Sequence, residues 1–204
     1  MAHMSSFPTE GGCDCRAVRY RLESAPTMLT IRRAEPSDAS PLADLAERTF
    51  RATFGAANSR ENMDAHCARA YGVAIQAAEI ANPEIETFVC DDGPRPVGYA
   101  QLRWGAAPPC VPAKRPAEIQ RIYVDQPWQG KGIAQALMSE MLAAARRGNA
   151  DQIWLGVWEN NARAIAFYLR SGFKKVGHHV FQLGDDPQHD WILCRDVRDA
   201  GSDA

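Results

Sequence analysis

This 204-residue sequence lacks several features that would point to other classes of protein. No apolar run approaches the roughly 18 consecutive residues that a membrane-spanning helix needs. The 23 Lys and Arg residues do not outnumber the 25 Asp and Glu residues, and the formal net charge of -2 disfavours a dedicated nucleic-acid-binding protein. The chain starts without a basic region followed by an apolar run, so we expect no secretory signal. These absences predict a cytoplasmic protein that uses neither a membrane nor a nucleic acid as its partner.

Cysteine is also too sparse for disulfides to be the main source of stability. Six cysteines in a chain of this length do not indicate a disulfide framework, and we expect them to be mostly reduced. Cys13 and Cys15 belong to a segment, residues 11–20, that resembles the start of a glutathione-dependent formaldehyde-activating zinc domain, with Arg16 where that family has glycine. Two thiolates fall short of the four ligands of a structural zinc site, so we expect no metal, with a metal or redox role for this pair as the alternative. Residues 1–27 are interpreted as an extension or a fusion remnant.

What remains has the composition of a soluble globular domain. Apolar residues make up 46% and charged residues 24% of the chain, which suits one domain, predicted at residues 28–197, followed by a flexible tail at 198–204. Hydrophobic periodicity and turn residues predict the order of elements. Strands are expected at 29–32, 86–90, 97–104, 118–125, 152–158, 173–182 and 190–197, and helices at 38–52, 60–82 (one or two), 132–147 and 161–171. This order predicts an α/β fold with a mixed sheet.

The most informative stretch is residues 122–134, in which a strand leads through a glycine-containing turn into a helix. The first turn of a helix has free N–H groups and the positive end of the helix dipole, which together favour a phosphate. Gly130 and Gly132 let the backbone approach a phosphate closely, and Lys131 adds a positive charge. Glycines at a helix start also serve as caps or packing positions. A Walker loop is excluded because Gly132 follows Lys131, and a dinucleotide fingerprint because Gln135 stands where Gly or Ala is needed.

Two motifs in this half of the chain are similar to those of a known family. Gln129, Gly132 and Ala134 match motif A of the GCN5-related N-acetyltransferases (GNAT), written Gln/Arg-x-x-Gly-x-Gly/Ala. Asn161, Ala164, Tyr168, Gly172 and Phe173 resemble its motif B. The resemblance implies a GNAT fold, with a central mixed, mostly antiparallel sheet flanked by helices, and acetyl-CoA as cosubstrate. Residues 154–161, 164–168 and 179–190 further resemble the bacterial polyamine N-acetyltransferases of the PaiA type.

The resemblance also implies which residues bind acetyl-CoA. The central strand of the family splays from the following strand, so its free backbone groups, here at Ile122, Tyr123 and Val124, pair with the pantetheine arm. A backbone N–H near Val124 then polarises the thioester carbonyl. The other residues that the resemblance assigns to the cofactor are Gln129, Gly130, Lys131, Gly132, Ile133, Ala134, Asn161, Ala164, Phe167 and Tyr168.

The implied reaction is direct attack of a primary amine on the thioester of acetyl-CoA. With a pKa near ~10.4, only about one alkyl amine in 2,500 is neutral at pH 7, so a base is useful. Glu118 is the predicted base, because period-two alternation puts it on the same strand face as Ile122 and Val124. The alternative for Glu118 is a solvated carboxylate at a strand start. Tyr168 is the predicted general acid for the departing thiolate, and its alternative is a core tyrosine.

The sequence says less about the acceptor amine. Asp185 and Asp186, in the turn of the last hairpin, would attract a polycationic amine such as spermidine, although Asp is also a common turn former. The alternatives are a protein or antibiotic N-acetyltransferase and a non-catalytic acyl-CoA-binding regulatory module. We therefore expect a small-molecule or peptide amine as substrate. Members of the family often form pairs, so the resemblance allows a homodimer.

Overall fold

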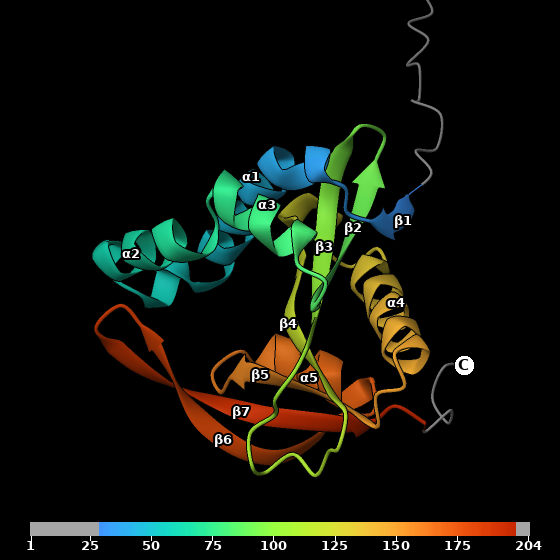
Figure 1. The fold of residues 1–204 in the computed structure, drawn as a ribbon. Coiled ribbons are helices and arrows are strands. Elements are labelled where there is room, and N and C mark those ends of the chain that lie inside the picture. Colours follow the sequence, from blue (N-terminus) through green and yellow to red (C-terminus); the bar gives the residue numbers. More distant parts are fainter. Residues whose placement is uncertain (1–28, 199–204) are drawn as a thin grey trace, which may run out of the picture.

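The computed structural model describes residues 29–198, which form one seven-stranded sheet with helices on both faces (Figure 1). The predicted extension at 1–27, including Cys13 and Cys15, and residues 199–204 lie outside the described residues. The strands are β1 (Thr30–Arg33), β2 (Ile85–Asp92), β3 (Arg95–Trp104), β4 (Pro116–Val124), β5 (Gln152–Trp158), β6 (Lys174–Leu183) and β7 (Asp186–Asp196). The helices are α1 (Ala39–Phe54), α2 (Arg60–Ala70), α3 (Val73–Ala81), α4 (Ile133–Arg147) and α5 (Ala162–Arg170).

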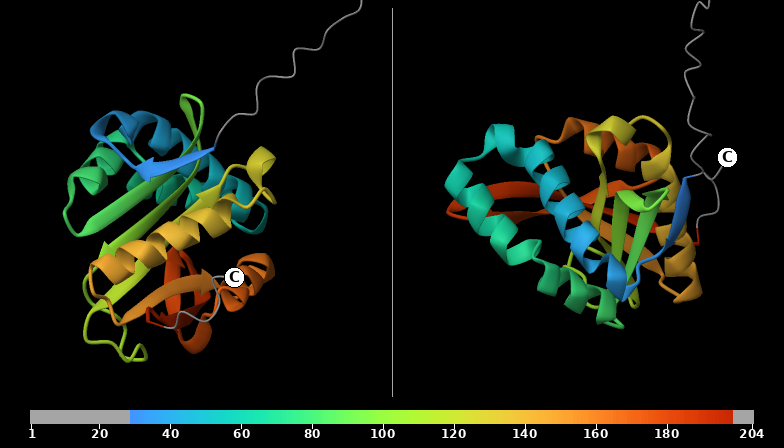
Figure 2. Two further views of the ribbon diagram at one scale, coloured as in Figure 1. Left: turned by 90° about the vertical axis from the view of Figure 1, so that its right-hand side faces the viewer. Right: turned by 90° about the horizontal axis from the view of Figure 1, so that it is seen from above.

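The strand order is β1-β2-β3-β4-β5-β7-β6, and every neighbouring pair is antiparallel except β4 and β5. The predicted mixed, mostly antiparallel sheet is therefore confirmed. Helices α4 and α5 cover one face of the sheet and α1 to α3 the other (Figure 2). Within residues 29–198, none of the helices has the length and apolar character that a bilayer crossing requires. The four described cysteines are free thiols.

Every predicted element exists, and the largest boundary difference is at β7, which begins at Asp186 instead of residue 190. Leu183 pairs with Asp186, so only Gly184 and Asp185 form the turn between β6 and β7. Gly184 has φ +60°, which a two-residue hairpin turn with glycine at its first position requires. This tight turn extends the strand pairing to the hairpin tip.

The two central parallel strands separate soon after they meet. Pairing between β4 and β5 runs from Pro116 to Glu118 on β4 and ends where Glu118 lies opposite Trp154. Beyond that point, residues 119–124 of β4 and 155–158 of β5 have no partners on each other. The splay that the resemblance implied is confirmed. Backbone N–H and C=O groups that face such a gap are open to a ligand that can satisfy them.

A β-bulge in β4 overturns one expectation about Glu118. Leu102 of β3 pairs with Ile119 and Gln101 pairs with Arg121, so Gln120 is an extra residue in β4. The extra residue shifts the alternation, and Ile119 and Ile122 both face the core beneath α4. Glu118 therefore points to the opposite face. The prediction that Glu118 shares a strand face with Ile122 and Val124 is wrong, because period two holds only in an unbroken strand.

Candidate active site

A groove of about 440 Å³ lies between the end of β4, the turn that follows it, and the first turns of α4 and α5. It brings together all the residues that the sequence predicted for the cofactor except Lys131. The predicted residues that line it are Ile122, Tyr123, Val124, Gln129, Gly130, Gly132, Ile133, Ala134, Asn161, Ala164, Phe167 and Tyr168. The ammonium of Lys131 instead lies 4.2 Å from the centre of the Trp128 ring.

The turn at one end of the groove has the geometry of an anion site. Gly130 and Gly132 adopt φ +78° and +81°, and a Cβ at either position would meet no atom within 4 Å, so the space beside the turn is open. Helix α4 begins at Ile133 without a side-chain cap. Its first N–H groups and the positive end of its dipole therefore remain available to a phosphate.

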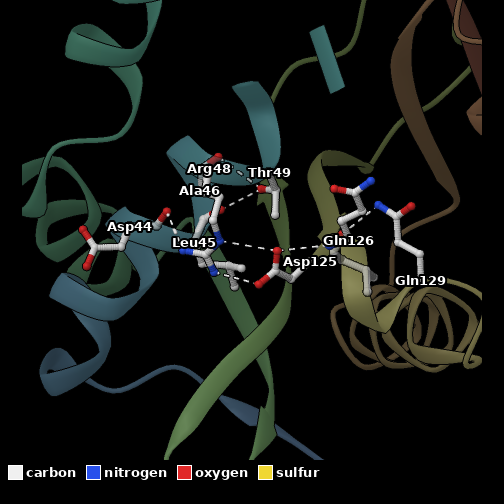
Figure 3. Close-up of polar contacts among 9 residues, drawn as sticks. Asp44, Leu45, Ala46, Arg48, Thr49, Asp125, Gln126 and Gln129 are labelled. Carbon is white, nitrogen blue, oxygen red and sulfur yellow. Dashed lines mark hydrogen bonds and ion pairs between the residues drawn. The ribbon is translucent and has the colours of Figure 1, made fainter. Parts of the chain in front are cut away.

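This turn is held from both sides (Figure 3). Asp125 accepts a hydrogen bond from the backbone N–H of Gln126 at 3.0 Å, and its carboxylate pairs with Arg48 of α1 at 2.9 Å. On the other side, the Gln129 amide Nε2 donates to the carbonyl of Val124 at 3.0 Å. The turn is thereby fixed relative to the strand that precedes it.

The edge of β4 that faces the gap presents a backbone donor. The N–H of Asp125 bonds to the carbonyl of Val97 on β3, and successive N–H groups of a strand point to opposite sides. The N–H of Val124 therefore points away from β3, toward the splayed side. The backbone N–H of Val124 thus faces the gap, and its role as an oxyanion donor stays a prediction.

Sequence reasoning missed two cations in the groove, Arg163 and Arg170 of α5. Arg163 donates from Nη1 to Oε1 of Gln129 at 2.6 Å, so it links motif B to the motif A turn. The signal was present, since Arg163 follows Asn161 by two residues at the start of the motif B helix. Asn161 itself caps α5 by accepting from the N–H of Ala164 at 3.1 Å.

A second cavity, of about 410 Å³, lies at the opening between the splayed ends of β4 and β5. Its lining combines aromatic and polar side chains from α1, α2, β3, β4, β5, α5, β6 and β7. The aromatic residues that line it are Phe50, Phe54, His66, Tyr71, Tyr123, Trp158, Tyr168, His179 and Phe181. The cavity and the groove share the lining residues Ile122, Tyr123, Asn161, Ala164 and Tyr168, which we call the junction.

Tyr168 is a titratable group at the junction that can act as an acid. Its side chain is buried, and its ring packs edge-on against Phe167 and Phe173 at centroid distances of 5.4 and 5.9 Å. Burial raises the pKa of Tyr168 above its usual value, and the nearby Tyr123 adds to this shift. The phenol therefore keeps its proton at neutral pH and can donate it.

The charged residues of the cavity are mostly paired. Glu118 lines the cavity, and its Oε2 accepts two hydrogen bonds from Arg103, at 2.9 Å from Nε and 2.5 Å from Nη2. Arg121 pairs with Glu79 of α3 at 2.6 Å. Glu118 stands five residues before Tyr123, roughly 15 Å along the strand. The role of Glu118 as the base stays a prediction.

The hairpin aspartates do not line the cavity. The Asp185 backbone N–H donates to Oδ1 of Asn62 at 3.1 Å, and the Asp186 carboxylate accepts from Gln188 at 2.9 Å. The acidic residue of this hairpin that does line the cavity is Asp190, which sequence reasoning did not single out. Within the described part of the chain, no group of three or more His, Cys, Asp or Glu side chains is arranged to hold a metal ion.

Comparison with known proteins agrees with this geometry. The family model described as Acetyltransferase (GNAT) family matches residues 41–173. The chain belongs to this family. An uncharacterized N-acetyltransferase of Mycobacterium tuberculosis is 32% identical over 161 residues, which cover 79% of this chain and 99% of that protein. The N-alpha-acetyltransferase RimI of the same organism is 36% identical over 100 residues, 48% of this chain and 58% of its own.

A solved structure gives the same fold. The PaiA N-acetyltransferase of Thermoplasma acidophilum, in complex with coenzyme A, superposes with a TM-score of 0.66 at 19% identity and covers 82% of this chain and 98% of its own. At 19% identity, the similarity to the PaiA-type protein shows a shared fold. Members of the GNAT family use acetyl-CoA, and the chain is an acetyl-CoA-dependent acyltransferase.

Proposed function

We propose that the protein transfers an acetyl group from acetyl-CoA to the primary amine of a compact small molecule, by direct attack at the junction. The observation that carries this proposal is that groove and cavity share Tyr123, Tyr168 and three further residues. A thioester that reaches the end of the groove would meet an amine that enters through the cavity. Both substrates would then be held with their reacting atoms close, which removes much of the entropy cost of a bimolecular reaction.

The residues of the groove suit acetyl-CoA. The open glycine turn and the uncapped start of α4 would hold the pyrophosphate, with Arg163 and Arg170 supplying positive charge. The free edge of β4 at residues 122–124 would pair with the pantetheine arm. In this position the N–H of Val124 polarises the thioester carbonyl.

Tyr168 would complete the transfer. When the amine has attacked and the carbon–sulfur bond breaks, the thiolate of coenzyme A leaves, and the Tyr168 hydroxyl donates a proton to it. The leaving thiol has a pKa near ~8.5, so protonation helps its departure without being indispensable. The raised pKa of Tyr168 keeps its hydroxyl protonated across the neutral range.

The charges of the cavity favour an acceptor with a single ammonium and an apolar body. Two carboxylates line the cavity, Glu118 and Asp190, and Glu118 is already bound by Arg103. Aromatic walls suit both an apolar group and an ammonium, through cation–π attraction. A volume of about 410 Å³ lies in the range of small-molecule sites.

A polyamine such as spermidine is a second candidate acceptor. Asp185 and Asp186 lie two and three residues beyond Leu183, which lines the cavity, at the hairpin tip. There they would meet a second ammonium that extends beyond the cavity. A peptide amino terminus is a third candidate, since the relative RimI is named an N-alpha-acetyltransferase. A homodimer and a cytoplasmic location stay predictions.

A free-thiol release assay with acetyl-CoA would test the proposal against a panel of compact monoamines, spermidine, aminoglycosides and peptides. Mass spectrometry of each amine would check for the gain of one acetyl group. We expect turnover with a compact monoamine, and less turnover in Tyr168→Phe than in the wild type. Absence of any acetylated amine, with acetyl-CoA bound, would contradict the proposed acceptor class. Turnover that is highest with spermidine would favour the polyamine.

A further inference from the structure

A histidine–aspartate pair that the mechanism above does not use lies in the acceptor cavity. His179 of β6 and Asp190 of β7 are directly opposite each other in the antiparallel ladder, and both line the cavity. His179 Nε2 lies 3.6 Å from Asp190 Oδ2. The His179 side chain is 39% exposed and that of Asp190 is 13% exposed. The imidazole is therefore open to the cavity while the carboxylate behind it is largely covered.

The neighbouring strand leaves room for this pair. Gly156 of β5 also lines the cavity, and a Cβ there would lie 3.2 Å from Cε1 of His179 and 3.4 Å from Oδ2 of Asp190. The 3.2 Å contact is tighter than ordinary packing, so a side chain at position 156 would push against the His179 imidazole, whereas the 3.4 Å contact with Asp190 is ordinary. The absence of one lets the pair lie against the end of β5, beside the opening toward β4.

The charge of Asp190 also affects the pKa of a junction residue. The Asp190 carboxylate raises the pKa of Tyr123, a junction residue, in addition to the larger effect of burial. The pKa of Asp190 is itself raised, by burial first and by Glu159 to a smaller extent, whereas His179 opposes this shift. His179, Asp190 and Tyr123 line the same cavity, so the pair and the junction share one solvent space.

We propose that His179, oriented by Asp190, is the proton acceptor that converts the incoming ammonium into the reactive amine. This inference rests on the proposed acetyl transfer and deepens it. The Asp190 carboxylate lies 3.6 Å from His179 Nε2, an ion-pair distance, and so places a negative charge beside this edge of the ring. The other ring nitrogen, Nδ1, is then the one left for the proton transfer. Asp190 is therefore a positioning residue, and His179 is the group that touches the substrate.

The protons balance in this scheme. The ammonium of the acceptor gives one proton to neutral His179 and becomes a neutral amine. Its nitrogen lone pair forms the new C–N bond at the thioester carbonyl, and the C–S bond breaks with its electron pair on sulfur. The nitrogen then loses a second proton while Tyr168 protonates the departing thiolate, and this second proton restores Tyr168. His179 releases its proton to solvent, which gives amide, thiol and one H⁺.

His179 fits this role better than Glu118. Glu118 is held by two hydrogen bonds from Arg103 and stands at the start of β4, before the strands splay. The other charged or titratable groups that face the cavity are fixed in pairs or packed among rings. Arg121 pairs with Glu79, and His66 stacks on Phe50 with centroids 4.4 Å apart.

The test is the pH dependence of kcat/KM for the best amine of the panel, in the wild type, His179→Gln, Asp190→Asn and Glu118→Gln. His178→Gln is the matched control, because His178 is the adjacent histidine, is exposed and does not line the cavity. We expect His179→Gln to lower kcat/KM by roughly 10²–10⁴-fold. It should also remove the enzyme's acidic limb, while the KM for acetyl-CoA and the melting temperature stay close to the wild type.

Asp190→Asn separates a positioning role from a merely structural one. Without the carboxylate beside the ring, the imidazole is less firmly oriented, so kcat/KM should fall, but less than in His179→Gln, while the KM for acetyl-CoA and the melting temperature stay close to the wild type. An acidic limb that persists in His179→Gln but disappears in Glu118→Gln would overturn the inference and leave the proposed function standing. A wild type that acetylates no amine would overturn both. His178→Gln with the same loss as His179→Gln would also contradict the assignment.

Discussion

Replacing Tyr168 with Phe tests the chemistry of the junction with a minimal change. The substitution removes one hydroxyl and keeps the ring, which packs against Phe167 and Phe173. Since the ring contacts persist, we expect the protein to fold and the KM for acetyl-CoA to stay within about twofold of the wild type, a difference of roughly 0.4 kcal/mol. The effect should fall on kcat.

The size of the effect follows from the role of the hydroxyl. Burial holds the pKa of Tyr168 above its usual value, so the phenol is protonated at every pH at which the enzyme is assayed. Loss of a positioned acid for a thiolate that can also leave unprotonated should lower kcat by roughly 10–10³-fold. That decrease equals about 1.4–4 kcal/mol of transition-state stabilisation.

Steady-state thiol release at saturating acetyl-CoA is the assay, with Tyr99→Phe as the matched control. Tyr99 is another buried tyrosine, in the hydrophobic cluster beneath α1, and lines neither the groove nor the cavity. We expect Tyr99→Phe to keep the wild-type kcat. A Tyr168→Phe enzyme with unchanged kcat would refute the acid role, and an equal loss in both variants would attribute the effect to core packing.

Four further predictions follow from individual contacts. Arg163→Ala should raise the KM for acetyl-CoA by about tenfold in steady-state kinetics, because it removes one cation from the groove. Gly132→Ala should lower the free energy of unfolding by roughly 1–2 kcal/mol in urea titrations, because a Cβ residue at φ +81° is strained. Tyr99→Phe should raise that free energy by about 1 kcal/mol, because its buried hydroxyl has no hydrogen-bond partner among the described residues. Asp38→Asn should lower it by about 1 kcal/mol at pH 7, because Arg32 holds the pKa of Asp38 below its usual value.

Each of these has a contradicting result. The pKa of Asp38 is depressed in the folded state, so its stabilisation is complete above the unfolded pKa near ~3.9 and declines as the pH falls below it. An Asp38→Asn difference that grows on acidification would have the wrong sign. An Arg163→Ala enzyme with unchanged KM would remove Arg163 from the cofactor site. Unfolding free energies equal to the wild type would contradict the predictions for Gly132 and Tyr99.

The sequence could predict the elements of the fold and the groove because their signals are local. Apolar periodicity marks the strands and helices, and the glycine turn from Gln129 to Gly132 stands next to the helix it starts. The second motif is equally local, with Asn161 capping the helix that carries Tyr168. These short-range patterns indicate which residues line the groove before any long-range contact is known.

The rest depends on pairing between distant segments. The bulge at Gln120 arises from the register between β4 and β3, and a single strand read alone gives no sign of it. The partnership of His179 with Asp190 likewise follows from the register of a hairpin. Here a signal existed, because a two-residue turn at Gly184 and Asp185 already aligns His179 with Asp190. The pattern of the turn itself instead pointed to Asp185 and Asp186 as the acidic residues of the acceptor site.

The most direct test of the cofactor groove is backbone hydrogen exchange of the full chain with and without acetyl-CoA. We expect slower exchange on binding at two places, residues 122–124 on the free edge of β4 and residues 129–134 of the turn and first turn of α4. Protection at these segments, weakened in Arg163→Ala, would support the cofactor groove as the site of acetyl delivery. Saturating acetyl-CoA that protects other segments and leaves these two unchanged would contradict it.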